Sequence, residues 1–117
     1  MSAIHLLLTV EIAPENAVTW RELMTEMVAS TESEPGTTIY EWYYSADEGT
    51  CCIHERYRDS MACDEHVANF IANFGARFLG SAKSVAVVVH GDPSATVRET
   101  IAGLEPVYLE LAAGFAR

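Results

Sequence analysis

Basic residues are scarce in this sequence: 7 lysines and arginines stand against 17 aspartates and glutamates, for a formal net charge of −10 at pH 7. Nucleic acids and the anionic faces of membranes carry dense negative charge, so a surface this acidic repels both. We therefore expect no nucleic-acid partner and no membrane partner. The acidic residues are spread along the chain, which is typical of a solvated surface. A neutral or cationic small ligand suits this charge better.

Cysteine is also sparse, and its spacing excludes the cysteine-rich classes of protein. The cysteines are Cys51, Cys52 and Cys63. They form no CxxC pair and leave one residue over, which favours reduced thiols over a disulfide scaffold. Cys52 and His54 share a strand face, but two ligands without a third at motif spacing do not predict a metal site. We interpret His5 and His90 as structural and expect no metal.

Long hydrophobic runs are absent as well. The apolar run over residues 4–10 is broken by His5 and Thr9, and it is too short for a secretion signal. No run approaches the roughly 20 apolar residues of a membrane-spanning helix. Half of the residues are hydrophobic, which is enough to bury a core. We expect a cytoplasmic protein with one domain over residues 1–117.

Hydrophobic periodicity predicts alternating strands and helices. The expected elements are a strand over 4–12, a helix from 17 that ends in a loop over 30–36, strands over 37–45 and 50–57, a helix that begins at 59 or 60 and breaks near 75, and a strand over 84–90. The loop over 46–49 closes a hairpin, and Gly49 can take the positive φ that such a turn needs. A short helix over 92–102 and an extended segment over 106–111 follow.

This β-α-β-β-α-β order predicts a ferredoxin-like α+β fold. Connection rules place both helices on one face of a four-stranded antiparallel sheet. The opposite face carries Leu7 and alternate valines, which is too apolar to leave in water, so we expect a second subunit to cover it as a homodimer. The extension over 92–117 could pack on the core or across that partner.

Three stretches carry a resemblance to a known family. They read PGT-x-x-YEW over 35–42, ERY-x-DS-x-A-x-x-x-H over 55–66, and GDPS-x-x-V-R-x-x-I-A-G-x-x-PVYLE-x-x-AGFAR over 91–117. Together they resemble the antibiotic biosynthesis monooxygenase family. The resemblance implies a dimeric α+β barrel, with sheets face to face and a pocket between sheet and helices. It also implies oxygenation of quinols or phenols without metal, flavin or other cofactor, although relatives degrade haem or isomerise a sugar phosphate.

The candidate catalytic residues are His66, Glu55 and Tyr57. His66 matches the family histidine, and an ordinary pKa near 6.5 suits a base. Glu55 and Tyr57 share one strand face, where an apolar pocket can turn a carboxylate into a base. The alternatives are a histidine bonded to a backbone carbonyl and a salt bridge from Glu55 to an arginine. Tyr57 stands where family oxygenases usually carry tryptophan.

The candidate substrate-binding residues are Tyr40, Trp42, Asn69 and Asn73. Tyr40 and Trp42 share a strand face and could stack on an aromatic ring, although such rows also form cores and interfaces. Asn69 and Asn73 fall beside His66 on the helix and could orient a ligand carbonyl, or they could be solvated. The sequence thus predicts a cofactor-independent monooxygenase of a small aromatic quinol or phenol. The alternatives are a non-catalytic dimeric module that binds a small ligand, and an isomerase on the same scaffold.

Overall fold

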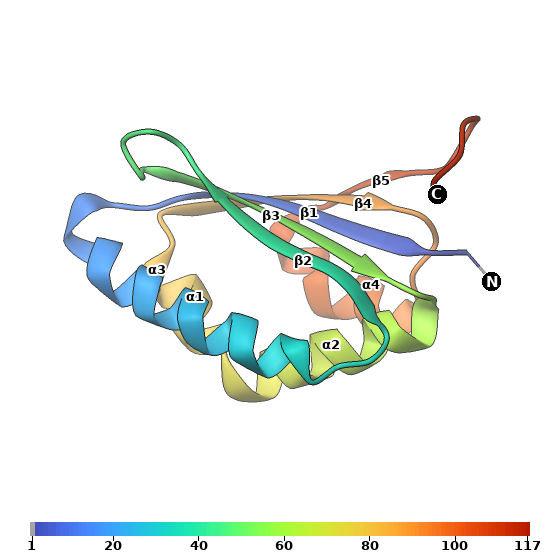
Figure 1. Cartoon of the computed structure of the whole chain (residues 1–117), viewed down its shortest axis with the longest axis horizontal. Helices are drawn as coiled ribbons and strands as arrows, with labels where there is room; N and C mark the ends of the chain where they lie inside the picture. Colours follow the sequence, from blue (N-terminus) through green and yellow to red (C-terminus); the bar gives the residue numbers. More distant parts are fainter. Residues whose placement is uncertain (1) are drawn as a thin grey trace.

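The computed structural model describes residues 2–117 (Figure 1). In chain order its elements are β1 (Ile4–Glu11), η1 (Pro14–Asn16), α1 (Ala17–Glu32), β2 (Thr37–Tyr44), β3 (Thr50–Tyr57), α2 (Ser60–Asn73), α3 (Gly75–Ser81), β4 (Ser84–His90), α4 (Ala95–Ile101), η2 (Ala102–Leu104) and β5 (Val107–Leu109). The predicted α+β order is therefore confirmed up to β4. All the helices cover one face of the sheet, and the other face is open.

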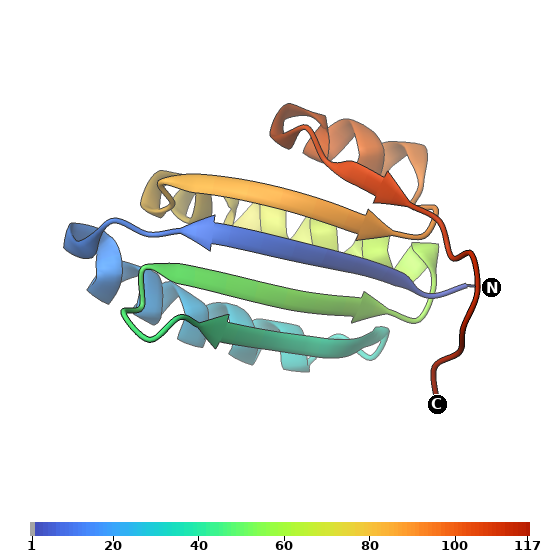
Figure 2. The same cartoon turned by 90° about the horizontal axis from the view of Figure 1, so that it is seen from above.

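The sheet has five strands in the order β2-β3-β1-β4-β5 (Figure 2). The first four pair antiparallel, as the sequence predicts, but β5 pairs parallel with β4. The sheet is thus mixed, and the extended tail segment belongs to it. The reason is that α4 and η2 carry the chain back along the edge of β4, where Val88 pairs with Val107 and His90 with Leu109. A parallel pair needs a crossover of this kind.

Alternation along the strands sorts their side chains between the two faces. On β1, Ile4, Leu6 and Val10 are buried under the helices, whereas Thr9 is exposed on the open face. The buried residues form two clusters. One lies around Tyr57, α2 and α4, and the other lies around Trp20, α1 and α3. The candidate site lies between them.

Several local boundaries differ from the sequence-based prediction or refine it. α1 extends to Glu32 instead of ending at residue 30, because the buried side chain of Thr31 continues its inner face. In the hairpin loop the left-handed residue is Glu48, with φ of 59°, and not Gly49. The predicted break in the second helix is confirmed: α2 ends at Asn73 and α3 begins at Gly75. Asp59 caps α2 by accepting a hydrogen bond from the amide of Ala62 (2.9 Å).

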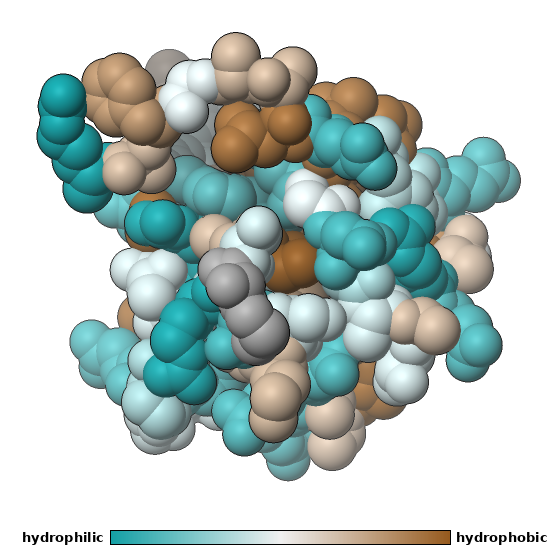
Figure 3. Space-filling model, turned by 90° about the vertical axis from the view of Figure 1, so that its right-hand side faces the viewer, coloured by the Kyte–Doolittle hydropathy of each residue, from teal (hydrophilic) through white to brown (hydrophobic). Residues whose placement is uncertain are grey.

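The open face of the sheet is partly apolar. Figure 3 shows hydrophobic side chains gathered at the top of that view, which is the side of the open face. Tyr43, Val107 and Leu109 are exposed there. The second subunit that the sequence leads us to expect on this face stays a prediction.

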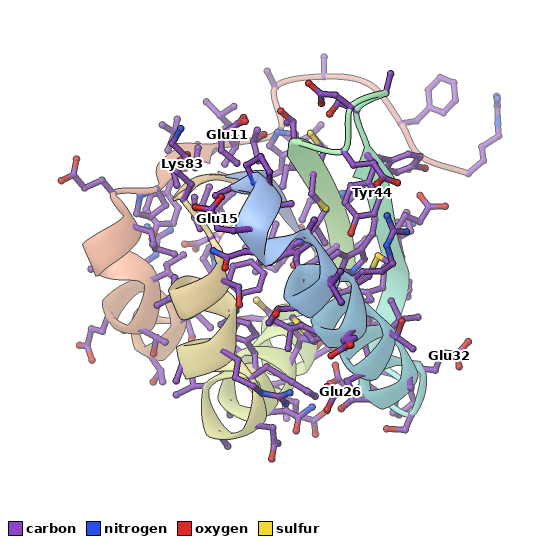
Figure 4. All side chains as sticks on the ribbon, turned by 90° about the vertical axis from the view of Figure 1, so that its left-hand side faces the viewer. Glu11, Glu15, Glu26, Glu32, Tyr44 and Lys83 are labelled. Carbon is purple, nitrogen blue, oxygen red and sulfur yellow. The ribbon has the colours of Figure 1, made fainter. Side chains whose placement is uncertain are left out.

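Acidic side chains mark the opposite end of the sheet from the termini. Figure 4 shows Glu11 and Glu15 beside Lys83, where the chain enters β4. The backbone amide of Lys83 donates to the carbonyl of Glu11 (2.8 Å) and joins the two strand ends.

Within residues 2–117, no helix is both long enough and apolar enough to cross a membrane.

Candidate functional site

A cavity of about 300 Å³ lies between the sheet and the helices. Strands β1, β3 and β4 form its roof, α2 and α3 form one wall, and α4 with η2 forms the opposite wall. Figure 2 shows α4 on the β5 side of the sheet, away from α1. Nearly all lining side chains are apolar; the polar ones are Glu55, His66 and Thr100. This composition, a hydrophobic space with a few convergent polar groups, is typical of a small-molecule site.

Glu55 and His66 meet at the closed end of this cavity. Each residue is only 5% exposed. Glu55 points inward because it alternates with the open-face residues of β3, and His66 lies on the inner side of α2. The Nε2 atom of His66 lies 3.3 Å from Oε1 of Glu55. The hydroxyl of Tyr57 donates a hydrogen bond to the same carboxylate oxygen.

Glu34 completes the arrangement from the loop before β2. Its Oε1 atom accepts a hydrogen bond from Nδ1 of His66 (2.8 Å). The loop approaches α2 closely at Gly36, where an added Cβ would lie 2.5 Å from the Cβ of Ala62. This explains the glycine of the 35–42 motif, since only a residue without a side chain lets the loop bring Glu34 to His66.

Two carboxylates therefore flank one imidazole. Burial alone would lower the pKa of His66, but hydrogen bonds and charge from Glu34 and Glu55 outweigh it and raise the pKa to about 9. His66 is thus an imidazolium ion at neutral pH, with no free nitrogen to accept a proton. This differs from the base with an ordinary pKa that the sequence suggested. Burial and the charge of Glu55 raise the pKa of Tyr57 well above its usual value, so Tyr57 remains a donor.

The two asparagines lie behind His66. The amide of Asn69 donates to Oε2 of Glu34 (3.0 Å) and to the hydroxyl of Ser30 (3.1 Å). The amide of Asn73 donates to Oδ1 of Asn69 (2.6 Å) and is exposed. Neither residue lines the cavity. Asn69 therefore supports the Glu34 carboxylate and Asn73 supports Asn69, and the substrate-binding role of both stays a prediction.

The aromatic row of β2 packs on the core around the site. The rings of Tyr40 and His66 lie 5.5 Å apart, and Trp42 lies 5.6 Å from Trp20. Tyr40 and Trp42 do not line the main cavity. Their proposed stacking on a substrate ring therefore also stays a prediction. Burial raises the pKa of Tyr40, which keeps its hydroxyl neutral beside Glu55.

Cys52 and His54 lie on the open face, away from the cavity. Nε2 of His54 is 3.1 Å from Nδ1 of His5, and Sγ of Cys52 is 3.8 Å from Oγ1 of Thr9. The ring of His90 lies 5.8 Å from that of His5. Across residues 2–117, no group of three or more His, Cys, Asp or Glu side chains is arranged to hold a metal ion.

Sequence reasoning missed two parts of the site. Glu34 lies 32 positions before His66, and no spacing rule connects a loop carboxylate with a helix at that separation. The wall formed by α4 and η2 had a usable signal: Val97, Ile101 and Leu104 follow the i, i+4, i+7 spacing of a buried helix face. Ser94 ties this wall to α2 through a hydrogen bond to Asp64 (2.5 Å).

Comparison with known proteins agrees with this architecture. Residues 3–70 match the family model described as antibiotic biosynthesis monooxygenase. The Mycobacterium tuberculosis protein named "Putative monooxygenase Rv0793" is 40% identical over 53 residues, which are 45% of this chain and 52% of that protein. The chain therefore spans about half the length of this curated relative.

Solved structures share the fold. MupZ from Pseudomonas fluorescens has a TM-score of 0.85 at 21% identity, over 100% of this chain and 96% of MupZ. This likeness shows the fold alone. The structure of Rv0793 has a TM-score of 0.64 at 29% identity, over 80% of this chain and 97% of Rv0793. Because the family model covers more than half of the sequence, the chain belongs to the antibiotic biosynthesis monooxygenase family.

Proposed function

We propose that this protein is a cofactor-independent monooxygenase that oxidises a small quinol or phenol with O₂. One observation carries the proposal: a carboxylate and an imidazolium ion, Glu55 and His66, lie together at the closed end of an apolar cavity. Family membership and the name of Rv0793 support the same class of reaction. The volume of about 300 Å³ is near the lower end of the range of small-molecule sites, which suits a small aromatic ring.

In this proposal Glu55 is the base and His66 stabilises the anion. The carboxylate of Glu55 lines the cavity and accepts the proton of a substrate hydroxyl. The imidazolium of His66 stabilises the resulting phenolate, since opposite charges attract strongly where water is excluded. Glu34 holds the imidazolium in place through Nδ1, and Tyr57 fixes the carboxylate of Glu55.

The substrate itself supplies the electrons. The quinolate gives one electron to O₂, which forms a semiquinone and superoxide. These two radicals join through a new C–O bond at a ring carbon, and the peroxide takes up one proton. The O–O bond then breaks as that carbon loses its hydrogen, so one oxygen atom leaves as water and the other becomes a carbonyl. A quinol and O₂ thus give a hydroxyquinone and water, and the equation balances without another reductant.

Oxygen uptake with a panel of quinols and phenols tests the proposal. We expect at least one member to consume O₂ faster with the protein than in buffer, with one O₂ used for each quinol oxidised. A parallel run under nitrogen separates the alternatives. Turnover without O₂ would indicate an isomerase, and binding without turnover would indicate a ligand-binding module. Either result would overturn the oxygenase assignment.

The position of Gly103 provides a test of the cavity. Gly103 lines the wall formed by η2, and an added Cβ there meets no atom within 4 Å. We expect Gly103→Phe to fold normally and to place its ring across the opening. Crowding of this kind costs about 1–3 kcal/mol, or roughly five- to 150-fold in affinity. Binding of the fluorescent phenol naphthol, followed by titration, measures the loss.

Gly80 provides the matched control. An added Cβ at Gly80 also meets no atom within 4 Å, but Gly80 does not line the cavity. Gly80→Phe should therefore bind naphthol as the unmodified protein does. Equal affinities for the two variants would show that phenols bind elsewhere.

A further inference from the structure

The cavity lining changes from buried and charged at the closed end to exposed and mainly apolar at the opening. Glu55 and His66 at the closed end are each 5% exposed. At the other end, Ile71 of α2 is 53% exposed and Leu79 of α3 is 50% exposed, although both line the cavity. Gly103 is also exposed, on the opposite wall. Thr100, the exposed polar residue of the lining, donates its hydroxyl to the carbonyl of Thr96 in its own helix (2.8 Å). The cavity is therefore a pocket with a charged floor and a mainly apolar mouth between α3 and η2.

The apolar lining is continuous from the floor to the surface. Val67 and Phe78 line the cavity and are buried, and Ile71 and Leu79 are the exposed lining residues of the same two helices. Ile71 and Leu79 belong to neither buried cluster, so the core does not account for them. Single exposed apolar residues need no explanation. Ile71 and Leu79 do need an explanation, because both extend the lining of one cavity into solvent.

We propose that the natural substrate carries an unbranched alkyl or alkenyl chain on its hydroxylated ring. The ring lies at Glu55 and His66, and the chain leaves through the mouth over Ile71 and Leu79. This inference rests on the proposed function for the position of the ring. A polar substituent at this position would lose hydrogen bonds with water against apolar walls, which disfavours it.

The position of the mouth agrees with this assignment. The mouth lies on the helix side of the sheet, because the residues that form it belong to α2, α3 and η2 (Figure 1). A subunit that covered the open face would leave the mouth free. A chain longer than the cavity can therefore extend into solvent along Leu79 without clashing.

A homologous series of alkyl hydroquinones tests the proposal. Binding is measured by calorimetry under nitrogen for the methyl, propyl, hexyl and nonyl compounds, each below its micelle concentration. Complete burial of one methylene improves affinity about fourfold. We expect affinity to rise steeply from methyl to propyl and to keep rising, less steeply, along the half-exposed mouth. The kcat/KM for O₂ uptake should follow the same order.

Substitutions at the mouth locate the chain. Ile71→Ser and Leu79→Ser should reduce, several-fold, the affinity that the hexyl and nonyl compounds gain over methyl hydroquinone, with methyl hydroquinone measured on the same variant as the reference. Val18→Ser is the matched control, because Val18 is 71% exposed on α1 and does not line the cavity. It should not alter the series.

The outcomes separate this inference from the proposed function. The alkyl-chain assignment would be wrong if affinity did not change along the series, even if methyl hydroquinone is oxidised. It would also be wrong if the affinity gained by the longer compounds survived both mouth substitutions. An affinity that rises along the series and depends on Ile71 and Leu79 supports the alkyl-chain assignment. If that rise occurs with no O₂ consumed by any compound, the chain assignment stands and the oxygenase assignment fails.

Discussion

Glu55→Gln is expected to lower kcat/KM for the active quinol by about 100- to 10,000-fold, the usual contribution of a general base. The amide has nearly the same shape and can still accept the hydrogen bond from Tyr57, but it cannot take a proton. The substitution also removes one of the two negative charges that keep His66 protonated. Binding of the quinol under nitrogen should weaken much less than turnover.

Glu22→Gln is the matched control for this substitution. Glu22 is exposed on α1 and lies outside the cavity lining, so the same chemical change should leave activity unaltered. Circular dichroism and urea unfolding establish that the Glu55→Gln variant is folded. A folded Glu55→Gln enzyme that keeps more than about a tenth of the activity would exclude Glu55 as the general base.

The second large effect is a loss of stability at alkaline pH. The pKa of His66 is raised from 6.5 to about 9 on folding, so the folded state holds this proton more tightly than the unfolded state does. The stabilisation is complete below about pH 6.5 and is lost as the pH rises through about 9. The loss is on the order of 3 kcal/mol. Urea unfolding at a series of pH values between these limits measures it.

Two histidine variants isolate this contribution. His66→Gln should be less stable near pH 6.5 and should show a much flatter dependence on pH, because the group that titrates is gone. His90→Gln, an exposed histidine of β4, should keep the slope of the unmodified protein. If His66→Gln kept that slope, the ion pairs with Glu34 and Glu55 would not stabilise the fold.

The pH dependence of activity should follow the same proton. If the imidazolium stabilises the substrate anion, turnover falls as the pH rises through about 9, although the free quinol ionises more readily there. A chemical step limited only by substrate ionisation would speed up instead. The direction of this change thus distinguishes catalysis by the His66 cation from simple solvation of a quinolate.

The sequence by itself determined which residues share a face within each element. Alternation along residues 50–57 placed Glu55 and Tyr57 on one side of a strand, and helical periodicity placed His66 beside an apolar stripe. Both placements are local consequences of backbone geometry, with repeats of two and 3.6 residues. The β-α-β-β-α-β order followed from the same repeats. The motif over 55–66 indicated the family before any contact was visible.

Only the tertiary structure decided what these residues do to one another. Glu34 reaches His66 because a loop passes Gly36 at close range, and β5 joins the sheet because α4 and η2 return the chain to β4. Contacts between residues far apart in the sequence leave no periodic signal. A pKa depends on burial and neighbouring charge, so the change of His66 from an ordinary base to a cation held between two carboxylates could be determined only from the folded structure.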